Sequence, residues 1–309
     1  MTGPDHRGDG DGWTECARGH RHWGLFGAAG VLLHRPGSSV GADIEVLLQH
    51  RVAWSHHGET WGLLGGARHR VESAEAGALR EAGEEADLGG AELGVQARFV
   101  DDHGGWTYST VLAATDRSAQ VQAAGRESIE VRWWPASIVG RDDGPPLHPG
   151  FASTWPLLRD QVSPTVVVVD AANVVGSRPD GWWRDRAGAA SRLLSSCARL
   201  AANGMTGTAL SVADPGRELL AHCWPRYVVV LEGQARLADP PAYGEGVEVR
   251  HAGASGDDEL VAAVRGTAGG TGRARVIVVT ADRGLRDRVT ALGALTVGPS
   301  WLLAHLPPG

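Results

Sequence analysis

Lysine is absent from this chain, because all 29 of its basic residues are arginine. The absence excludes a Schiff-base lysine and the lysine of a P-loop, so phosphate contacts must come from arginine side chains or backbone N–H groups. Cysteine is also scarce. Cys16, Cys197 and Cys223 lie far apart and match neither a disulfide framework nor a CxxC metal motif. We interpret them as ordinary thiols in a reducing compartment.

Long apolar runs are missing as well. The first 15 residues are polar and glycine-rich, and no later run approaches the ~20 apolar residues of a membrane span. The net charge of -7 and the pI near 6.0 argue against a protein that coats nucleic acid or anionic membranes, although a local basic groove stays open. We therefore expect a soluble cytoplasmic protein with no membrane partner and a disordered segment over residues 1–19.

The length of 309 residues, at ~150 residues per domain, favours two domains, which we place at residues 20–160 and 164–309. The boundary is expected near residues 158–164, where a helical segment ends before Pro164. In the first half, short apolar runs separated by glycine-rich turns predict strands of a mixed or antiparallel sheet. These strands are expected at residues 25–35, 44–51, 107–115 and 129–135, with helices at 73–86 and 149–162.

The second half alternates regularly between strands and helices. Its continuous valine and isoleucine runs predict a parallel sheet buried on both faces. The expected strands begin with the run 165–176 and continue at 226–233, 247–253, 275–282 and 295–298, with helices at 187–204, 257–268 and 283–293. The whole chain is thus expected to have an α/β fold, with a mixed-sheet domain followed by a parallel α/β domain.

Three glutamates fall within five residues of the first predicted helix. Glu81, Glu84 and Glu85 have the spacing i, i+3 and i+4, so they share one face of the helix. Clustered carboxylates suit Mg²⁺ or Mn²⁺, ions that are normally shared with substrate phosphates. The alternative for an arbitrary acidic run is a solvated helix face.

The surrounding residues resemble the Nudix box, G-x5-E-x7-R-E-U-x-E-E-x-G-U, where U is a bulky aliphatic residue. Gly66, Glu72 and Arg80 are followed by the three glutamates, so that every charged position of the pattern is filled at the right spacing. Two positions differ: Ala82 is small, and Asp87 replaces a glycine, a mild loss because aspartate tolerates positive φ better than most residues. The resemblance extends over about residues 20–160.

The Nudix resemblance implies an αβα sandwich around a mixed sheet and a pyrophosphohydrolase that cleaves a nucleoside diphosphate linked to another moiety. It implies that Glu81, Glu84 and Glu85 hold Mg²⁺ or Mn²⁺, with Gly66 among the ligands. A glutamate of this set or a loop carboxylate would activate water. Arg80 would orient a glutamate, Gly65 would support the loop, and Glu72 would either support the loop or ligate the metal. The substrate is expected to be a nucleotide or a nucleotide derivative.

The second half has acidic residues where its predicted strands end. Asp170 and Asp282 follow two valine-rich runs, and Asp257 and Asp258 begin a helix. Helix capping explains one aspartate at a helix start. It does not explain several acidic positions converging on the carboxyl edge of a parallel sheet, where ligands of open α/β folds bind. A second divalent-cation site is therefore predicted there.

The stretches VVDAANVVG, DDELV and VVTADRGLRDRV are together similar to a PIN-like nuclease domain of the NYN or YacP type. The similarity covers about residues 164–305 and implies a metal-dependent ribonuclease that acts on RNA. It implies Asp170, Asp258 and Asp282 as ligands, with Asp287 as a further candidate. Asn173 would position water or phosphate, and Asp257 competes with Asp258 for the same role.

Other functions remain compatible with the sequence. The Nudix half could bind a nucleotide without turnover and regulate the nuclease, although a pure binder has no need of all three glutamates. The two halves could together remove a 5′ cap or pyrophosphate from RNA and then cut it. The second half could also be a structural partner with a vestigial acidic edge.

Overall fold

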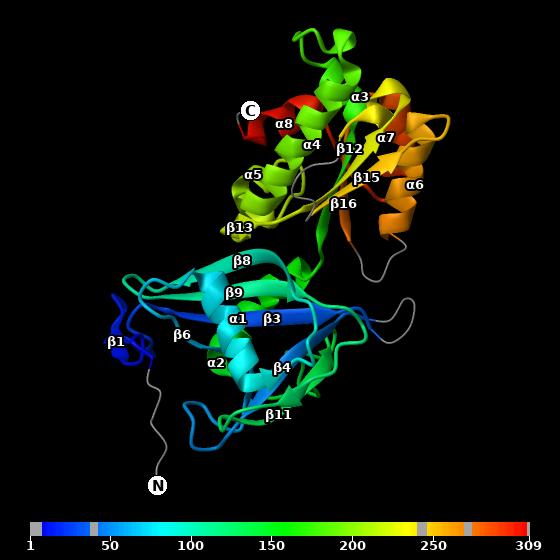
Figure 1. Ribbon diagram of the computed structural model, residues 1–309. Helices are drawn as coiled ribbons and strands as arrows, with labels where there is room; N and C mark the ends of the chain where they lie inside the picture. Colours follow the sequence, from blue (N-terminus) through cyan, green and yellow to red (C-terminus); the bar gives the residue numbers. More distant parts are fainter. Residues whose placement is uncertain (1–7, 38–42, 240–245, 269–273, 308–309) are drawn as a thin grey trace. The chain divides into compact units, whose positions relative to one another are not determined.

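The computed structural model describes residues 8–37, 43–239, 246–268 and 274–307. The chain forms two compact units, Met1–Val162 and Ser163–Gly309 (Figure 1). No helix of the described segments is both long and apolar enough to cross a membrane.

A mixed sheet forms the centre of the first unit. Its strands have the order β11-β4-β3-β9-β8. These strands are β11 (Ser128–Pro135), β4 (Glu45–Arg51), β3 (Ala28–Arg35), β9 (Thr107–Ala114) and β8 (Gly94–Asp102). Only the pairing of β3 with β9 is parallel in this order. The short strands β5 (Trp61–Gly62) and β6 (Leu64–Ala67) add antiparallel pairs to β4 and β3. The predicted mixed sheet is therefore confirmed.

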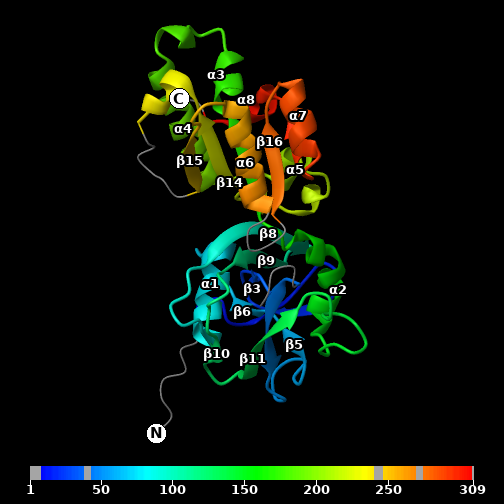
Figure 2. The same ribbon diagram turned by 90° about the vertical axis from the view of Figure 1, so that its right-hand side faces the viewer.

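The helices α1 (Ala74–Glu85) and α2 (Pro149–Leu158) lie on opposite faces of this sheet (Figure 2). Ser73 begins α1 by accepting a hydrogen bond at Oγ from Ala76 N at 3.1 Å, which satisfies one free amide of the first turn. The alanine stripe of α1 is buried against Val31 and Val111 of the sheet. Ala82 belongs to this stripe and is fully buried, so its small side chain lets the helix approach the strands closely.

The N-terminal segment differs from the sequence prediction. Residues 1–19 were expected to be disordered, but β1 (Trp13–Glu15) pairs antiparallel with β2 (Arg21–Trp23). The polar, glycine-rich composition concealed this hairpin, because its few apolar residues alternate over only three positions on each strand. The prediction for residues 1–7 lies outside the described residues.

The turn after α1 also differs from the expected one. Asp87 belongs to β7 (Ala86–Asp87), which pairs with β10 (Gln122–Ala123). The positive φ angles fall instead at Gly89 and Gly90, which have φ values of 61° and 73°. Asp87 Oδ1 accepts a hydrogen bond from Gly89 N at 2.9 Å. The chain thus turns two residues later than the family pattern implies, at glycines that accept this backbone conformation.

A five-stranded sheet with the order β15-β14-β12-β16-β17 forms the centre of the second unit. Every neighbouring pair is parallel, as the valine-rich runs predicted. The strand bounds, in sheet order, are Val247–His251, Arg226–Leu231, Thr165–Asp170, Arg275–Val279 and Leu295–Val297. The first strand is shorter than expected, because Asp170 ends β12 and caps the helix α3 (Ala171–Gly176).

Helices cover both faces of the parallel sheet (Figures 1 and 2). Val166 and Val168 of β12 pack in one cluster with α6 (Gly256–Ala268) and α7 (Arg283–Thr290). Val167 and Val169, which alternate with them, are equally buried on the face toward α4 (Arg186–Asn203). Two short α-helices remain, α5 (Gly207–Ser211) and α8 (Pro299–His305), together with the short strand β13 (His222–Cys223). The 3-10 helices are η1 (Arg159–Gln161), η2 (Trp182–Arg184), η3 (Arg217–Leu219) and η4 (Gly233–Leu237).

Candidate active site

The loop before α1 is fastened to the helix by an arginine–glutamate pair. Arg80 donates from Nε to Glu72 Oε1 at 2.9 Å and from Nη2 to Glu72 Oε2 at 3.0 Å. Arg80 Nη2 also donates to Ala67 O at 3.0 Å, and His69 N donates to Glu72 Oε2 at 3.0 Å. Arg80 holds the pKa of Glu72 below its usual range, so Glu72 stays ionised and keeps the loop closed.

Glu81 lies between this pair and strand β6. Its Oε1 accepts a hydrogen bond from Arg80 Nη1 at 2.8 Å, which fixes the side chain. A Cβ atom at Gly66 would lie 2.4 Å from Glu81 Oε2, so only glycine leaves room for the carboxylate. Burial raises the pKa of Glu81 despite the nearby guanidinium. A carboxylate in this position therefore gains from an additional positive charge.

Glu85 is held by the neighbouring residues of the sheet. Its Oε2 accepts a hydrogen bond from Gly65 N at 2.7 Å, and its Oε1 accepts one from Gln49 Nε2 at 3.0 Å. Gln49 is fully buried and accepts a short hydrogen bond from Ser128 Oγ. Burial raises the pKa of Glu85 to about 8, and the charge of Glu81 adds to the effect. A nearby cation would therefore stabilise the ionised forms of both Glu81 and Glu85.

Glu84 differs from the other two glutamates of the helix. Its side chain is 60% exposed, and it pairs with Arg80 Nη1 at 3.3 Å. It is therefore free to reorient toward a bound molecule. An exposed carboxylate beside two partly buried ones gives oxygen donors that suit Mg²⁺ or Mn²⁺ and leave coordination positions for phosphate oxygens. The acidic residues of this site thus fit a divalent cation.

A second group of polar residues lies at the carboxyl edge of the parallel sheet. Asp170 is buried, accepts a hydrogen bond from Asn173 N at 3.0 Å and accepts another from Thr280 Oγ1 at 2.9 Å. Asn173 Oδ1 accepts from Ala281 N at 3.1 Å, and Asp282 N donates to Thr280 Oγ1 at 3.1 Å. The ends of β12 and β16, which are neighbours in the sheet, are thereby linked.

Asp257 and Asp258 have different surroundings. Burial raises the pKa of Asp257, and the charges of Asp282 and Asp170 raise it further. Asp258 is 72% exposed and accepts a hydrogen bond from Arg288 Nη2 at 2.6 Å. Arg288 Nη1 also lies 4.0 Å from Asp257 Oδ2, so the two aspartates share this arginine, and Asp257 is the one whose pKa the charges of Asp170 and Asp282 raise. Asp287 is exposed on α7.

Two residues that the sequence analysis did not select take part in these sites. Gln49 supports Glu85, and Thr280 bridges Asp170 to the backbone of Asp282. Both are fully buried: Gln49 follows the apolar run 46–48 of β4, and Thr280 follows the apolar residues of β16. A buried polar group needs a partner, so a single polar residue within an apolar run is the signal that could have identified them.

Comparisons with known proteins identify the family of the first unit. The family model of the NUDIX domain matches residues 25–154. A Mycobacterium tuberculosis relative named "Putative 8-oxo-dGTP diphosphatase 3" is 45% identical over 161 residues, which cover 50% of this chain and 70% of the relative. The chain belongs to the Nudix family, and it is a Nudix hydrolase by virtue of its first unit.

Two further relatives have related names. A "Nucleoside triphosphate pyrophosphatase/Nudix hydrolase fusion protein" from Bifidobacterium longum is 41% identical over 151 residues, covering 48% of this chain and 30% of that protein. The crystal structure of a Nudix hydrolase from M. smegmatis, RenU, has 42% sequence identity and a TM-score of 0.45, covering 49% of this chain and 94% of that one. Members of the Nudix family generally depend on divalent metal ions.

Proposed function

We propose that the first unit is a divalent-metal-dependent pyrophosphohydrolase whose substrate is a nucleoside triphosphate, with an oxidised purine nucleotide as the preferred class. The observation that supports the reaction is the pair of partly buried carboxylates, Glu81 and Glu85, whose pKa values are both raised. The name of the M. tuberculosis relative supports the choice of nucleotide.

Glu81, Glu84 and Glu85, together with the carbonyl of Gly66, are the proposed ligands of Mg²⁺ or Mn²⁺. A divalent ion held by these residues would supply positive charge for the phosphate oxygens and would make the attacking water easier to deprotonate. Arg80 keeps Glu81 in place through its hydrogen bond of 2.8 Å. Glu85 is oriented by Gly65 and Gln49, so neither carboxylate has to reorganise when the substrate arrives. The exposed Glu84 is the proposed proton acceptor for the attacking water.

The test is a panel of substrates assayed with the full chain in Mg²⁺ or Mn²⁺. The panel contains 8-oxo-dGTP, the four unmodified deoxynucleoside triphosphates, ADP-ribose, dinucleoside polyphosphates, NADH and 5′-triphosphorylated RNA. Release of pyrophosphate and a nucleoside monophosphate from 8-oxo-dGTP in preference to dGTP supports the proposal. A preference for triphosphorylated RNA would replace it with RNA 5′-end processing. Nucleotide binding without any turnover would overturn it in favour of a sensor.

The acidic edge of the second unit favours a second candidate function, a PIN-like metal-dependent ribonuclease. Asp170, Asp257 and Asp282 are its proposed ligands, and Asn173 and Thr280 position them. The domain limits that we propose, 20–160 and 164–309, place one site in each domain. Cleavage of single-stranded RNA by the full chain in Mn²⁺, lost in Asp170→Asn, would support this function. Cleavage that persists in Asp170→Asn, or no metal-dependent cleavage by the wild type, would make the second unit a structural partner.

A further inference from the structure

The hairpin of β1 and β2 brings one thiol and two imidazoles together. Cys16 follows β1, His20 directly precedes the returning strand β2, and His22 is the middle residue of β2. Cys16 N donates to His20 O at 3.0 Å, and Gly19 N donates to Cys16 O at 2.9 Å, which closes the turn. Gly19 has a φ of 75°, a conformation that glycine adopts without strain. The spacing C-x3-H-x-H therefore forms a compact group.

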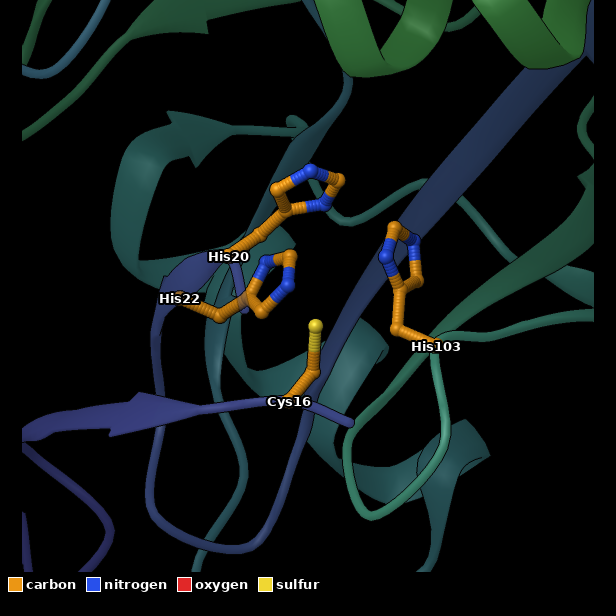
Figure 3. A group of neighbouring side chains, drawn as sticks. All are labelled: Cys16, His20, His22 and His103. Atoms are coloured by element: carbon orange, nitrogen blue, oxygen red, sulfur yellow. The ribbon is translucent and has the colours of Figure 1, made fainter. Parts of the chain in front are cut away.

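A third imidazole comes from a turn that is distant in the sequence. His103 follows β8, and the backbone fixes its turn against the hairpin, because Ala17 N donates to Gly104 O at 2.7 Å. Arg18 Nη2 also donates to Asp102 O at 2.7 Å. One donor atom of each of the four side chains lies within 4.8 Å of the others (Figure 3). Three imidazoles and a thiol are thus gathered at one point.

Two buried ring nitrogens of this group make no hydrogen bond with the described residues, so an external ligand can satisfy them. His22 Nε2 and His103 Nδ1 are buried and have no hydrogen-bond partner among the described residues. The other nitrogen of His103, Nε2, lies 3.0 Å from Asp101 Oδ2. If Nε2 donates its proton to Asp101, the lone pair of Nδ1 is directed into the group. A metal-ligating histidine commonly donates a hydrogen bond from its other ring nitrogen to a carboxylate, which fixes the orientation of the ring.

The ring of His22 is held in place by a stacked tryptophan. His22 stacks on Trp106, with ring centroids 4.0 Å apart and planes 9° from parallel. Trp106 is itself fixed, because its Nε1 donates to Gly24 O at 2.9 Å. His22 is thus held beside Cys16 and His103, while the exposed His20 can move toward a bound ion.

We propose that Cys16, His20, His22 and His103 bind a structural Zn²⁺ ion. Nitrogen and sulfur donors suit Zn²⁺ and not the Mg²⁺ or Mn²⁺ of the carboxylate site, so the two sites select different ions. Four protein ligands complete a tetrahedral shell and leave no open position for substrate, which makes the ion structural. The thiol of Cys16 is buried, and binding converts it to the thiolate.

The consequence for the first unit follows from the residues that precede the hairpin. Asp9 Oδ1 lies 2.9 Å from His69 Nδ1 and accepts a hydrogen bond from Arg70 N at 3.2 Å. Leu25 N donates to Gly10 O at 2.8 Å. Residues 69 and 70 belong to the loop that Glu72 and Arg80 close. A metal that orders the hairpin therefore also stabilises the N-terminal segment against the Nudix loop.

The test measures metal content and spectra on the full chain without a polyhistidine tag. After Mg²⁺ and Mn²⁺ are removed, we expect the wild type to retain about one Zn²⁺ per chain. Replacement by Co²⁺ should give the d–d bands of tetrahedral cobalt and a thiolate charge-transfer band in the near ultraviolet. Cys16→Ala should lose both the zinc and the charge-transfer band. The matched control Cys197→Ala removes a buried thiol of the second unit and should keep them.

Two further variants separate the parts of the proposal. Asp101→Asn should keep the site but lower its zinc affinity about 10- to 100-fold, because only the support of His103 is lost. His57→Asn changes the other histidine group, formed by His56, His57 and His148, and should leave the zinc content unchanged. A wild-type cobalt spectrum without a thiolate band would overturn the proposal, even if Cys16→Ala fails to fold. Zinc content that is equal in the wild type and in Cys16→Ala would also overturn it.

Discussion

Arg80 and Glu72 form a two-point ion pair, with hydrogen bonds of 2.9 and 3.0 Å between the guanidinium and both carboxylate oxygens. The pair connects α1 to the loop that precedes it. Arg80→Lys keeps the charge but cannot make the planar two-point contact. We expect the variant to lose roughly 1–2 kcal/mol of unfolding free energy in the first unit.

The same variant should also lower kcat about 10-fold or more, because Glu81 loses its fixed orientation. Urea unfolding and Mg²⁺-dependent turnover of the full chain check both expectations. Arg132→Lys, on an arginine that is 52% exposed, is a suitable control. Wild-type stability and turnover in Arg80→Lys would show that the pair does not organise the loop.

Glu85 should make the metal-free protein less stable as the pH rises. Burial raises its pKa in the folded state to about 8, while the unfolded chain ionises near pH 4.5. Between these values the folded state binds a proton that the unfolded state has lost, so the free energy of unfolding falls as the pH increases through this window. Thermal unfolding in EDTA from pH 5 to 8 measures the slope.

Two comparisons isolate the contribution of Glu85 to this slope. Glu85→Gln should be less dependent on pH than the wild type, because the glutamine does not titrate. Saturating Mg²⁺ should flatten the wild-type profile, since the ion binds the ionised form. An equal slope in the wild type and in Glu85→Gln would exclude Glu85 as its origin.

In the first unit, the structure brings together the residues that the Nudix box selected, but the sequence did not give the orientations of their side chains. The Nudix box identified Glu72, Arg80 and the three glutamates from spacing alone. It did not indicate that Glu84 is exposed while Glu85 faces Gly65, because neighbouring strands determine these environments. The Cys16 hairpin was missed for a similar reason, since His103 approaches it only through the fold. Contacts between distant segments are not encoded in local periodicity.

In the second unit, the valine runs predicted the parallel sheet because such runs are buried on both faces. The same runs could not indicate where strand β12 ends. Asp170 begins α3 by accepting a hydrogen bond from Asn173 N, so the apolar residues 174 and 175 belong to a helix and not to the strand. A short apolar run is too short for its periodicity to distinguish a strand from a helix. Here the capping hydrogen bond of Asp170 starts the helix.

Asp214 should be essential to the stability of the second unit. It is fully buried and accepts a hydrogen bond from Arg217 Nε at 3.0 Å, and Arg275 Nε donates to both of its oxygens at 2.8 Å. Removing the carboxylate takes away the acceptor of the 3.0 Å hydrogen bond from Arg217, which is itself buried. We expect Asp214→Ala to cost about 3–5 kcal/mol, measured by denaturant unfolding. A loss below 1 kcal/mol would contradict this account.

Asp257 and Asp258 provide a direct comparison at the acidic edge. The charges of Asp170 and Asp282 raise the pKa of Asp257, which lies 4.0 Å from Arg288 Nη1, whereas Asp258 is more exposed and lies 2.6 Å from Arg288 Nη2. We expect Asp257→Asn to weaken Mn²⁺ binding to the second site by about 10-fold or more, and Asp258→Asn to leave it unchanged. Titration calorimetry with a Glu84→Gln background limits the signal from the first site. The reverse order of effects would assign the site to Asp258.

The most direct test of the Nudix assignment is the rate of Mg²⁺-dependent pyrophosphate release by Glu84→Gln. Its side chain is 60% exposed, so the change should leave the fold intact. We expect kcat to fall at least ~100-fold, because the residue acts on the reacting groups. Glu92→Gln, at another exposed glutamate, should retain wild-type turnover. Wild-type turnover in Glu84→Gln would contradict the assignment of the catalytic site to this helix.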